Sequence, residues 1–337
     1  MVRKNKSWCR TSKSIIMKIF YTSFILTICT LTQLLAQVEN ISYRDWSDCY
    51  RISNKHCEVI VGASCGGRVL SFSLNGKNVI YENQAQNGKL LKDWEKERFD
   101  PDAGRFDFGP ELTTQPIHAQ TWMGKWDDEI IDSQTVRLTS MADTLLGLKC
   151  VREFKLKVDS AILIVSQTAI NITDKPLIRH FWGRTLVKPG GILFMPINPK
   201  SLFERGWGRF LWDPNRIESS NEVDDRVKVM PEIFTFHAVG KTLKGGTDAT
   251  DGWMAYAVDN LVFLKQFKVN NNQDYSGSDH MTEIFYSNGK FCELEPCSPT
   301  YTIKPGDSIE FSERWELKTM PTMKTTKTTI LKLIQKK

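Results

Sequence analysis

Apolar and polar residues alternate with a period of two along most of the chain, which is typical of β-strands buried on one face. The clearest example covers residues 69–74, stops at Asn75-Gly76 and resumes over residues 78–81. Asn-Gly between two such segments favours a β-hairpin, because both residues accept the positive φ angles of a type I′ turn. The pattern therefore predicts a hairpin near the start of the folded region.

The same alternation predicts further strands over residues 135–141, 145–157, 161–172, 177–187, 253–269, 281–286, 291–294 and 308–317. No segment has the pattern of a convincing amphipathic helix. Long antiparallel strands without helices imply packed sheets, so we expect an all-β protein in which residues 37–319 form a single β-sandwich. Residues 92–125 and 203–215 interrupt the pattern and are predicted to be long loops, whose tryptophans favour order.

The first 36 residues have the layout of a secretory signal peptide. A basic stretch precedes the apolar, uncharged residues 19–36, which end at the small residue Ala36. The alternative is a single membrane anchor, but Gln33 and several threonines weaken it. We expect cleavage of residues 1–36, a periplasmic or secreted protein, and no stable membrane span afterwards.

The charge of the chain belongs to this leader. The formal net charge of the 337 residues is +6, from 45 basic and 39 acidic side chains. The leader holds six basic residues and no acidic one, and 45 − 6 = 39 basic residues then balance the 39 acidic ones. A neutral mature chain argues against a nucleic-acid partner. The basic tail, residues 320–337, is expected to be loosely attached.

Six cysteines remain after the leader, and we expect at most one or two disulfides, with the pairing left open. No spacing suits a zinc site. Asp100, Asp102, Asp107 and Glu111 could gather a calcium ion, but their spacing does not match an EF-hand loop. We therefore expect no cofactor and no metal ligands.

The segment 177–187 carries the most informative chemistry. In a strand, His180, Trp182 and Arg184 share one face. An indole can stack on a sugar ring, a guanidinium can bind a carboxylate with two hydrogen bonds, and an imidazole can move a proton. The alternative is a solvent-facing strand with an incidental tryptophan, although tryptophan is costly to expose between two charges.

Glu293 and Glu295 share a face of the strand near the C-terminus, and adjacent like charges raise one carboxyl pKa, which suits acid or base catalysis. The alternative is a solvated outer face. If residues 117–126 are extended, His118 and Trp122 lie on one side together with Gln120.

Two further polar residues are candidates for substrate binding. Lys265 lies between Phe263 and Phe267 on one strand face, an apolar setting in which a lysine needs a partner. Tyr275 lies in the loop before Asp279-His280.

Several segments resemble the galactose-mutarotase-like superfamily. Cys65-Gly66-Gly67-Arg68 with the following hairpin is similar to its opening, and residues 171–176 are similar to the turn before its central strand. Residues 288–296, 303–307 and 313–317 resemble its closing strands. The resemblance implies a β-supersandwich of large antiparallel sheets, with a carbohydrate in the concave sheet.

The resemblance also implies a catalytic base. Glu295 best matches the base glutamate of mutarotases, with Glu293 as the rival. The chain departs from the pattern in the central strand, where Arg184 falls near the place of the acid histidine.

Together these features suggest an exported enzyme that acts on a uronate-bearing oligosaccharide by proton abstraction and β-elimination, as a dehydratase or lyase. Arg184, with Lys265 as helper, would neutralise the carboxylate, and His180 or His118 would be the base. Glu295 or Tyr275 would assist proton delivery, and Trp182, Trp122 and Glu293 would bind the sugar. The alternatives are an aldose 1-epimerase using Glu295 and a histidine, and a non-catalytic carbohydrate-binding protein.

Overall fold

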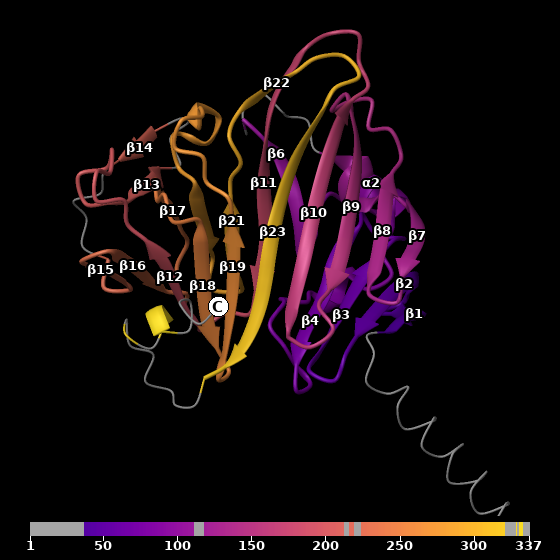
Figure 1. Cartoon of the computed structure of the whole chain (residues 1–337), viewed down its shortest axis with the longest axis horizontal. Helices are drawn as coiled ribbons and strands as arrows, with labels where there is room; N and C mark the ends of the chain where they lie inside the picture. The colour runs from indigo at the N-terminus through magenta and orange to yellow at the C-terminus, as the bar shows by residue number, and fades with distance from the viewer. Residues whose placement is uncertain are drawn as a thin grey trace, which may run out of the picture.

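The computed structural model describes residues 37–110, 118–211, 216–218, 224–320, 328 and 330–332. The predicted signal peptide, Glu111 and most of the C-terminal tail lie outside these residues. Within them, the strands form two antiparallel sheets, which are stacked so that β10 and β23 lie in front of β6 and β11 in Figure 1. The expectation of an all-β sandwich is confirmed.

The first sheet has the strand order β1-β2-β3-β4-β6-β11-β21-β20-β17-β13-β14, with β22 paired to β11 and β5 to β4. Its strands are β1 (Gln37–Tyr43), β2 (Trp46–Ser53), β3 (Cys57–Gly62), β4 (Arg68–Leu74), β5 (Lys77–Asn78), β6 (Gly104–Gly109), β11 (Leu177–Val187), β13 (Gly208–Leu211), β14 (Arg216–Glu218), β17 (Leu243–Thr247), β20 (Glu283–Ser287), β21 (Cys292–Pro296) and β22 (Tyr301–Ile303).

The second sheet has the order β15-β16-β12-β18-β19-β23-β10-β9-β8-β7. Its strands are β7 (Trp126–Asp132), β8 (Thr135–Ser140), β9 (Leu148–Leu156), β10 (Ile162–Asn171), β12 (Ile192–Pro196), β15 (Val227–Met230), β16 (Ile233–His237), β18 (Trp253–Val258), β19 (Leu261–Phe267) and β23 (Ser308–Thr319). Short helical segments are η2 (Gln84–Gln86), α2 (Leu91–Lys96), α3 (Ala119–Met123) and η3 (Ser276–Ser278).

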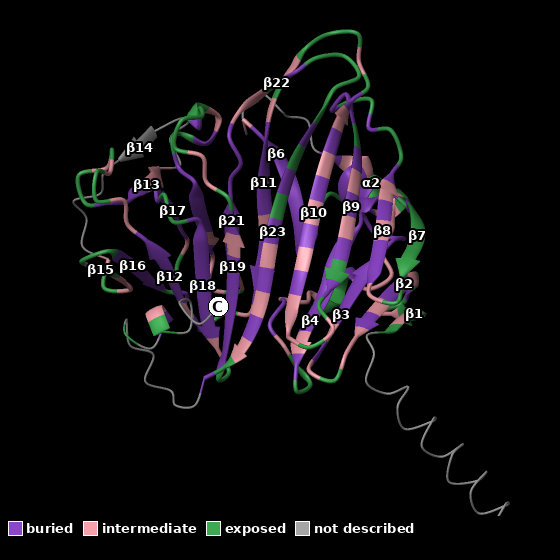
Figure 2. Cartoon of the chain, in the orientation of Figure 1, coloured by how far each residue is buried: buried purple, intermediate pink, exposed green. Residues whose placement is uncertain are grey.

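The strands that alternate most regularly in sequence are the ones the fold contains. β10 alternates between buried and half-buried residues along its whole length (Figure 2). The predicted hairpin exists, with Asn75 and Gly76 at φ angles of 52° and 73°. The predicted strand over residues 253–269 is two strands, because Asp259 and Asn260 adopt positive φ angles of 52° and 63° and form a turn.

The expectation of loops over residues 92–125 and 203–215 is wrong in part. The first segment contains most of α2, all of β6 and all of α3, and the second contains β13. Both strands are short: the alternation in β6 covers only the four residues 105–108, and β13 has four residues in all.

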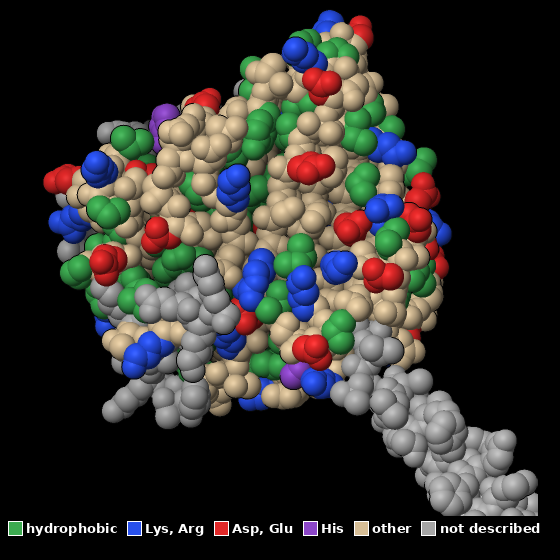
Figure 3. Space-filling view, in the orientation of Figure 1, with side chains coloured by type: hydrophobic (Ala, Val, Ile, Leu, Met, Phe, Trp, Pro, Cys, Tyr) green, Lys and Arg blue, Asp and Glu red, His purple; other side chains and the backbone are tan. Residues whose placement is uncertain are grey.

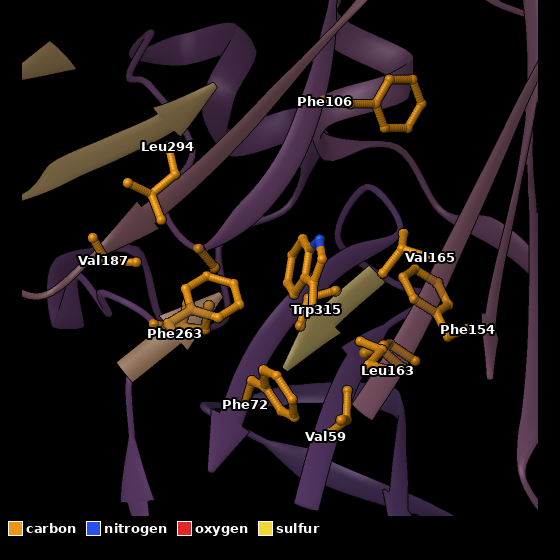
Figure 4. Packing of buried hydrophobic residues seen from close by; sticks show 14 of the residues in the cluster. Val59, Phe72, Phe106, Phe154, Leu163, Val165, Val187, Phe263, Leu294 and Trp315 are labelled. Atoms are coloured by element: carbon orange, nitrogen blue, oxygen red, sulfur yellow. The ribbon is translucent and has the colours of Figure 1, made fainter. Parts of the chain in front are cut away.

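The main core lies between the sheets, where aromatic rings from both meet (Figure 4). Trp315 of β23 contacts Phe72 of β4 and Phe263 of β19, at centroid distances of 6.5 and 5.3 Å. Phe181 of β11 stacks on Phe311 of β23 at 6.1 Å. The inward face of β11 is therefore fixed by the core, and the opposite face of the same strand is left for the site.

Six cysteines in the described part of the chain are buried free thiols: Cys49, Cys57, Cys65, Cys150, Cys292 and Cys297. Cys292 lies in the main core, whereas Cys297 packs with Trp182 in a separate cluster. The nearest pair in sequence is therefore split between different apolar environments. These thiols add to the core as small apolar side chains.

The outer face of the second sheet carries a smaller apolar cluster, which includes Trp253, Leu264 and Ile330. Ile330 is fully buried there, so this residue of the C-terminal tail is held against the sheet. Elsewhere on this side of the molecule, basic and acidic side chains are scattered together (Figure 3).

Candidate functional site

A cleft of about 690 Å³ lies on the face of the first sheet that turns away from the second sheet. Residues of β6, β11, β17, β20 and β21 form its floor, and the segment around α2 and α3 forms one wall. Because side chains alternate along β11, Phe181 faces the main core between the sheets, while Trp182 and Arg184 point to the opposite face and line the cleft. The predicted shared face is therefore the inner surface of a cleft.

Pairing of neighbouring strands brings acidic residues beside this face. Asp107 of β6 pairs with Trp182, and Glu293 of β21 pairs with Leu186 of β11. In the same way Tyr286 of β20 lies opposite Glu293. Residues that are far apart in the sequence thus line the same part of the cleft.

Arg184 is held by two carboxylates. Its Nη2 and Nε donate to the two oxygens of Glu293 at 2.8 and 3.1 Å, and its Nη1 donates to Asp107 Oδ2 at 2.8 Å. Asp107 Oδ1 accepts from Trp122 Nε1 at 2.7 Å. Burial disfavours the ionised form of Asp107, but Arg105 and Arg184 outweigh it and lower its pKa to about 2. The guanidinium predicted to bind a substrate carboxylate therefore already holds two protein carboxylates.

The two glutamates of β21 behave differently. Burial opposes ionisation of Glu293, but the Arg184 guanidinium outweighs it and lowers the pKa. Burial raises the pKa of Glu295 well above its ordinary value, and the neighbouring ionised Glu293 raises it further. The site thus combines an ionised carboxylate with a neutral carboxyl group at neutral pH.

Glu295 is also held in place. Its Oε2 accepts from Trp182 Nε1 at 2.7 Å, its carboxyl group is hydrogen-bonded to Glu293, and its Oε1 lies 4.0 Å from Arg184 Nε. The Nζ of Lys244 lies 4.7 Å from the centre of the Trp182 ring and opposes part of the rise in the pKa of Glu295. Glu295 therefore shares its proton with Glu293 and is fixed by the indole of Trp182.

His118 and Trp122 reach the cleft from α3, so the expectation of an extended segment is wrong here. Their rings stack at 5.2 Å, and His118 stacks at 6.0 Å on Phe108. His118 Nε2 accepts from the backbone N–H of Phe108 at 2.9 Å, and burial lowers the pKa of the imidazole. Through this hydrogen bond the imidazole links the start of α3 to β6.

The structure removes three predicted residues from the site. His180 shares the face of Trp182 but is covered: its ring nitrogens contact the carbonyl oxygens of Phe181 and Gly277, both at 3.1 Å. Burial lowers its pKa, and the imidazole fills the space left by Gly109, where a Cβ atom would approach it to 1.7 Å. His180 does not line the cleft, because the turn at Gly277 closes over it, so the structure does not place it where the predicted base would meet a substrate.

Lys265 lies between the sheets instead of in the cleft. Its Nζ is 2.9 Å from Glu313 Oε2 and donates to Thr185 at 2.9 Å. The partner that an apolar setting demands is therefore Glu313. Tyr275 is also outside the cleft lining, and its hydroxyl accepts from the backbone N–H of Asn270 at 3.2 Å.

The acidic residues proposed for calcium are engaged by arginines where the structure describes them. Asp102 accepts from Arg44 and Arg68, both at 2.7 Å, and Asp107 is held by Arg105 and Arg184. Glu111 lies outside the described residues. Within the described residues no three metal-binding side chains are grouped.

The sequence analysis missed several cleft residues. Lys244 lines the cleft from the short strand β17, and Arg105, which is not in the lining, pairs with Asp107 from β6, a segment expected to be a loop. Tyr81, Tyr286 and Phe291 line the outer end of the cleft. The spacing of Phe291 with Glu293 and Glu295, at alternate positions, was the available signal for this last residue.

No family model and no curated protein matches the chain. The structure, however, is similar to solved structures of one kind. A galactose mutarotase-like protein from Lactobacillus casei matches with a TM-score of 0.54 and 13% identity, over 80% of this chain and 100% of its own. A putative aldose 1-epimerase from Escherichia coli K12 matches with a TM-score of 0.52 and 10% identity, over 85% of this chain and 100% of its own. The chain has a galactose-mutarotase-like fold.

The Slr1438 protein from Synechocystis matches this fold as well, with a TM-score of 0.57 and 13% identity over 83% of this chain and 99% of its own. The fold resemblance inferred from the sequence segments is thus confirmed. Glu295, the residue that best matches the mutarotase base in the sequence, lines the cleft of this fold. No helix in the described part of the chain is long and apolar enough to cross a membrane.

Proposed function

We propose that the protein is a carbohydrate-active enzyme of the aldose 1-epimerase type, with Glu295 as the proton-transfer group. The observation that carries the proposal is the carboxyl pair on the cleft floor, in which Glu293 is ionised against Arg184 and Glu295 is neutral. Two carboxyl groups whose pKa values are pushed apart are suited to act as base and acid. The fold shared with putative aldose 1-epimerases adds to this reading.

Epimerisation at the anomeric carbon needs one proton donor and one proton acceptor. Glu295 would give its proton to the ring oxygen, while Glu293 takes the proton of the anomeric hydroxyl group. The bond between the anomeric carbon and the ring oxygen breaks, and a carbonyl group forms. Rotation of the open aldehyde and reversal of both transfers then give the other anomer.

The remaining contacts support the same roles. Trp182 holds Glu295 through its indole N–H, and its ring lies against Lys244 and Arg184, so its role here is to position the acid–base pair. Arg184 keeps Glu293 ionised and in place. No further cation is needed, because a neutral sugar brings no charge into the cleft.

The elimination reaction expected from the sequence fits the geometry less well. It requires a cation for the substrate carboxylate, and the three donor nitrogens of Arg184 already contact Glu293 and Asp107. Lys265 is committed to Glu313 between the sheets. Lys244 would have to take this role alone, beside Trp182.

The test is an anomerisation assay on residues 37–337. Proton NMR exchange spectroscopy on a panel of aldoses and reducing oligosaccharides follows the interconversion of the two anomers. We expect acceleration by the wild type, loss with Glu295→Gln, and full activity with Glu310→Gln on the exposed face of β23.

The same samples separate the alternatives. An unsaturated product, detected by its ultraviolet absorbance on uronate oligosaccharides, would replace our proposal by β-elimination. Binding without any turnover would replace it by a non-catalytic carbohydrate-binding protein. Export is a separate proposal, tested by sequencing the N-terminus of the protein recovered from the host's envelope, with Gln37 as the expected first residue.

A further inference from the structure

Three aromatic residues, Tyr81, Tyr286 and Phe291, form what we call the outer platform at one end of the cleft. The rings of Tyr81 and Phe291 lie 5.3 Å apart and are tilted by 39°, and those of Tyr286 and Phe291 lie 6.0 Å apart and are tilted by 45°. All three side chains are only partly buried. Aromatic faces left partly in water within a cleft indicate a ligand that covers them.

The outer platform lies at a distance from the acid–base pair. Phe291, Glu293 and Glu295 occupy alternate positions and face the same side. Because a strand rises about 3.3 Å per residue, Phe291 lies about 13 Å along the chain from Glu295. A single pyranose ring at Glu295 cannot cover a platform at that distance.

The volume of the cleft agrees with this separation. Pockets for drug-sized ligands measure about 300–1,000 Å³, and the 690 Å³ found here leaves room for more than one ring. Tyr81 is fixed by its backbone N–H, which donates to the carbonyl oxygen of Leu186 at 2.8 Å, so the platform is attached to the floor. Asn288 and Lys290 line the same end and offer polar groups to hydroxyl groups.

We propose that the outer platform is a second sugar-binding subsite and that the substrate is an oligosaccharide of at least two residues, with its reducing end at Glu295. This inference rests on the carbohydrate function proposed above and specifies its substrate class. The aromatic rings contact the C–H face of the second sugar, and the acid–base pair acts on the first.

The experiment measures binding by titration calorimetry to the Glu295→Gln form of residues 37–337, which prevents turnover. The probes are maltotetraose, cellotetraose, mannotetraose and a tetragalacturonate, each compared with its monosaccharide. We expect at least one tetrasaccharide to bind at least about tenfold more tightly than its monosaccharide, the size of one well-packed aromatic contact.

Phe291→Ala should remove that gain for the tetrasaccharide and leave monosaccharide binding unchanged, whereas Phe291→Trp should keep it. Thermal unfolding followed by circular dichroism checks that each variant is folded, and Tyr81→Ala provides a second test if Phe291→Ala is not. If no tetrasaccharide binds more tightly than its monosaccharide, or if the alanine variants weaken both equally, the second subsite is refuted. A different result would refute the epimerase proposal alone: the outer platform still strengthens tetrasaccharide binding, but the wild type does not accelerate anomerisation.

Discussion

Replacing Arg184 by methionine tests the charge arrangement at the centre of the site. Methionine keeps much of the side-chain volume and removes the guanidinium. The Arg184 side chain is 14% exposed, and its partners Glu293 and Asp107 are 2% and 4% exposed. The substitution therefore leaves both buried carboxylates with Arg105 as the remaining arginine that lowers their pKa values.

The magnitude follows from this burial. Removing one partner of a buried ion pair costs about 3–5 kcal/mol. Because Arg105 still pairs with Asp107, we expect the lower end, about 3 kcal/mol. That is a large share of a total stability of about 5–15 kcal/mol.

The loss should depend on pH. In the wild type the pKa of Glu293 is lowered, so its contribution to stability is present above its unfolded pKa and disappears as the pH falls through the folded value. Without Arg184 only Glu295 and Arg105 oppose burial, so this pKa should rise and the ionised carboxylate should destabilise the folded variant. The difference between wild type and Arg184→Met should therefore be largest above the raised pKa of the variant. It should shrink as the pH falls through that value, through the ordinary glutamate pKa of about 4.3, and through the lowered pKa of the wild type.

Guanidinium chloride unfolding, followed by tryptophan fluorescence at neutral pH and again below the ordinary glutamate pKa, measures the free energy of unfolding of each variant. Arg137→Met is the matched control, because Arg137 contacts Glu129 and Glu153 on the exposed face of the second sheet and such pairs contribute little. Equal losses for Arg184→Met and Arg137→Met, or a loss that does not change with pH, would refute the reasoning. Adding Glu293→Gln to Arg184→Met should restore much of the stability.

Two further substitutions probe other buried charges. Burial raises the pKa of Glu283 well above its ordinary value, so the folded protein loses stability as the pH rises and this carboxyl group must ionise. Glu283→Gln should therefore raise the midpoint of thermal unfolding above neutral pH and leave it unchanged in acid. The control Glu310→Gln, at an exposed position, should not change the midpoint at either pH. Lys265→Met leaves the buried Glu313 with Arg152 as its remaining cation and should cost about 3 kcal/mol in guanidinium unfolding, the lower end for a buried pair. A loss below about 1 kcal/mol, the size expected for an exposed ion pair, would contradict this account.

The regular strands could be predicted from the sequence, because apolar and polar residues alternate in a strand that is buried on one face. β10 and β23 are of this kind, and the segments that carry them were correctly placed. β6 was missed because its alternation of Arg105 and Asp107 with Phe106 and Phe108 covers only four residues between two glycines. Four residues are the shortest alternation that indicates a strand, so such a short pattern does not distinguish a strand from a loop.

The site was predicted where it depends on one strand and missed where it depends on contacts between strands. Trp182 and Arg184 line the cleft as their shared face predicts, but His180 does not, because Gly277 covers it from a segment almost a hundred positions away. Lys265 was correctly expected to need a partner, yet no local pattern could say that Glu313 would be it. Pairing across distant segments is a property of the fold and not of any one stretch of sequence.

The strand β11 lies between β6 from the first third of the chain and β21 from its last part. A nascent polypeptide that has reached only β11 therefore carries Arg184 beside Asp107 but has neither of the carboxyl groups supplied by β21. Such non-local pairing slows folding, because a long loop must close before the contact is made. Synthesis must therefore pass β21 before the cleft can hold its two glutamates, and a product that ends before β21 lacks both.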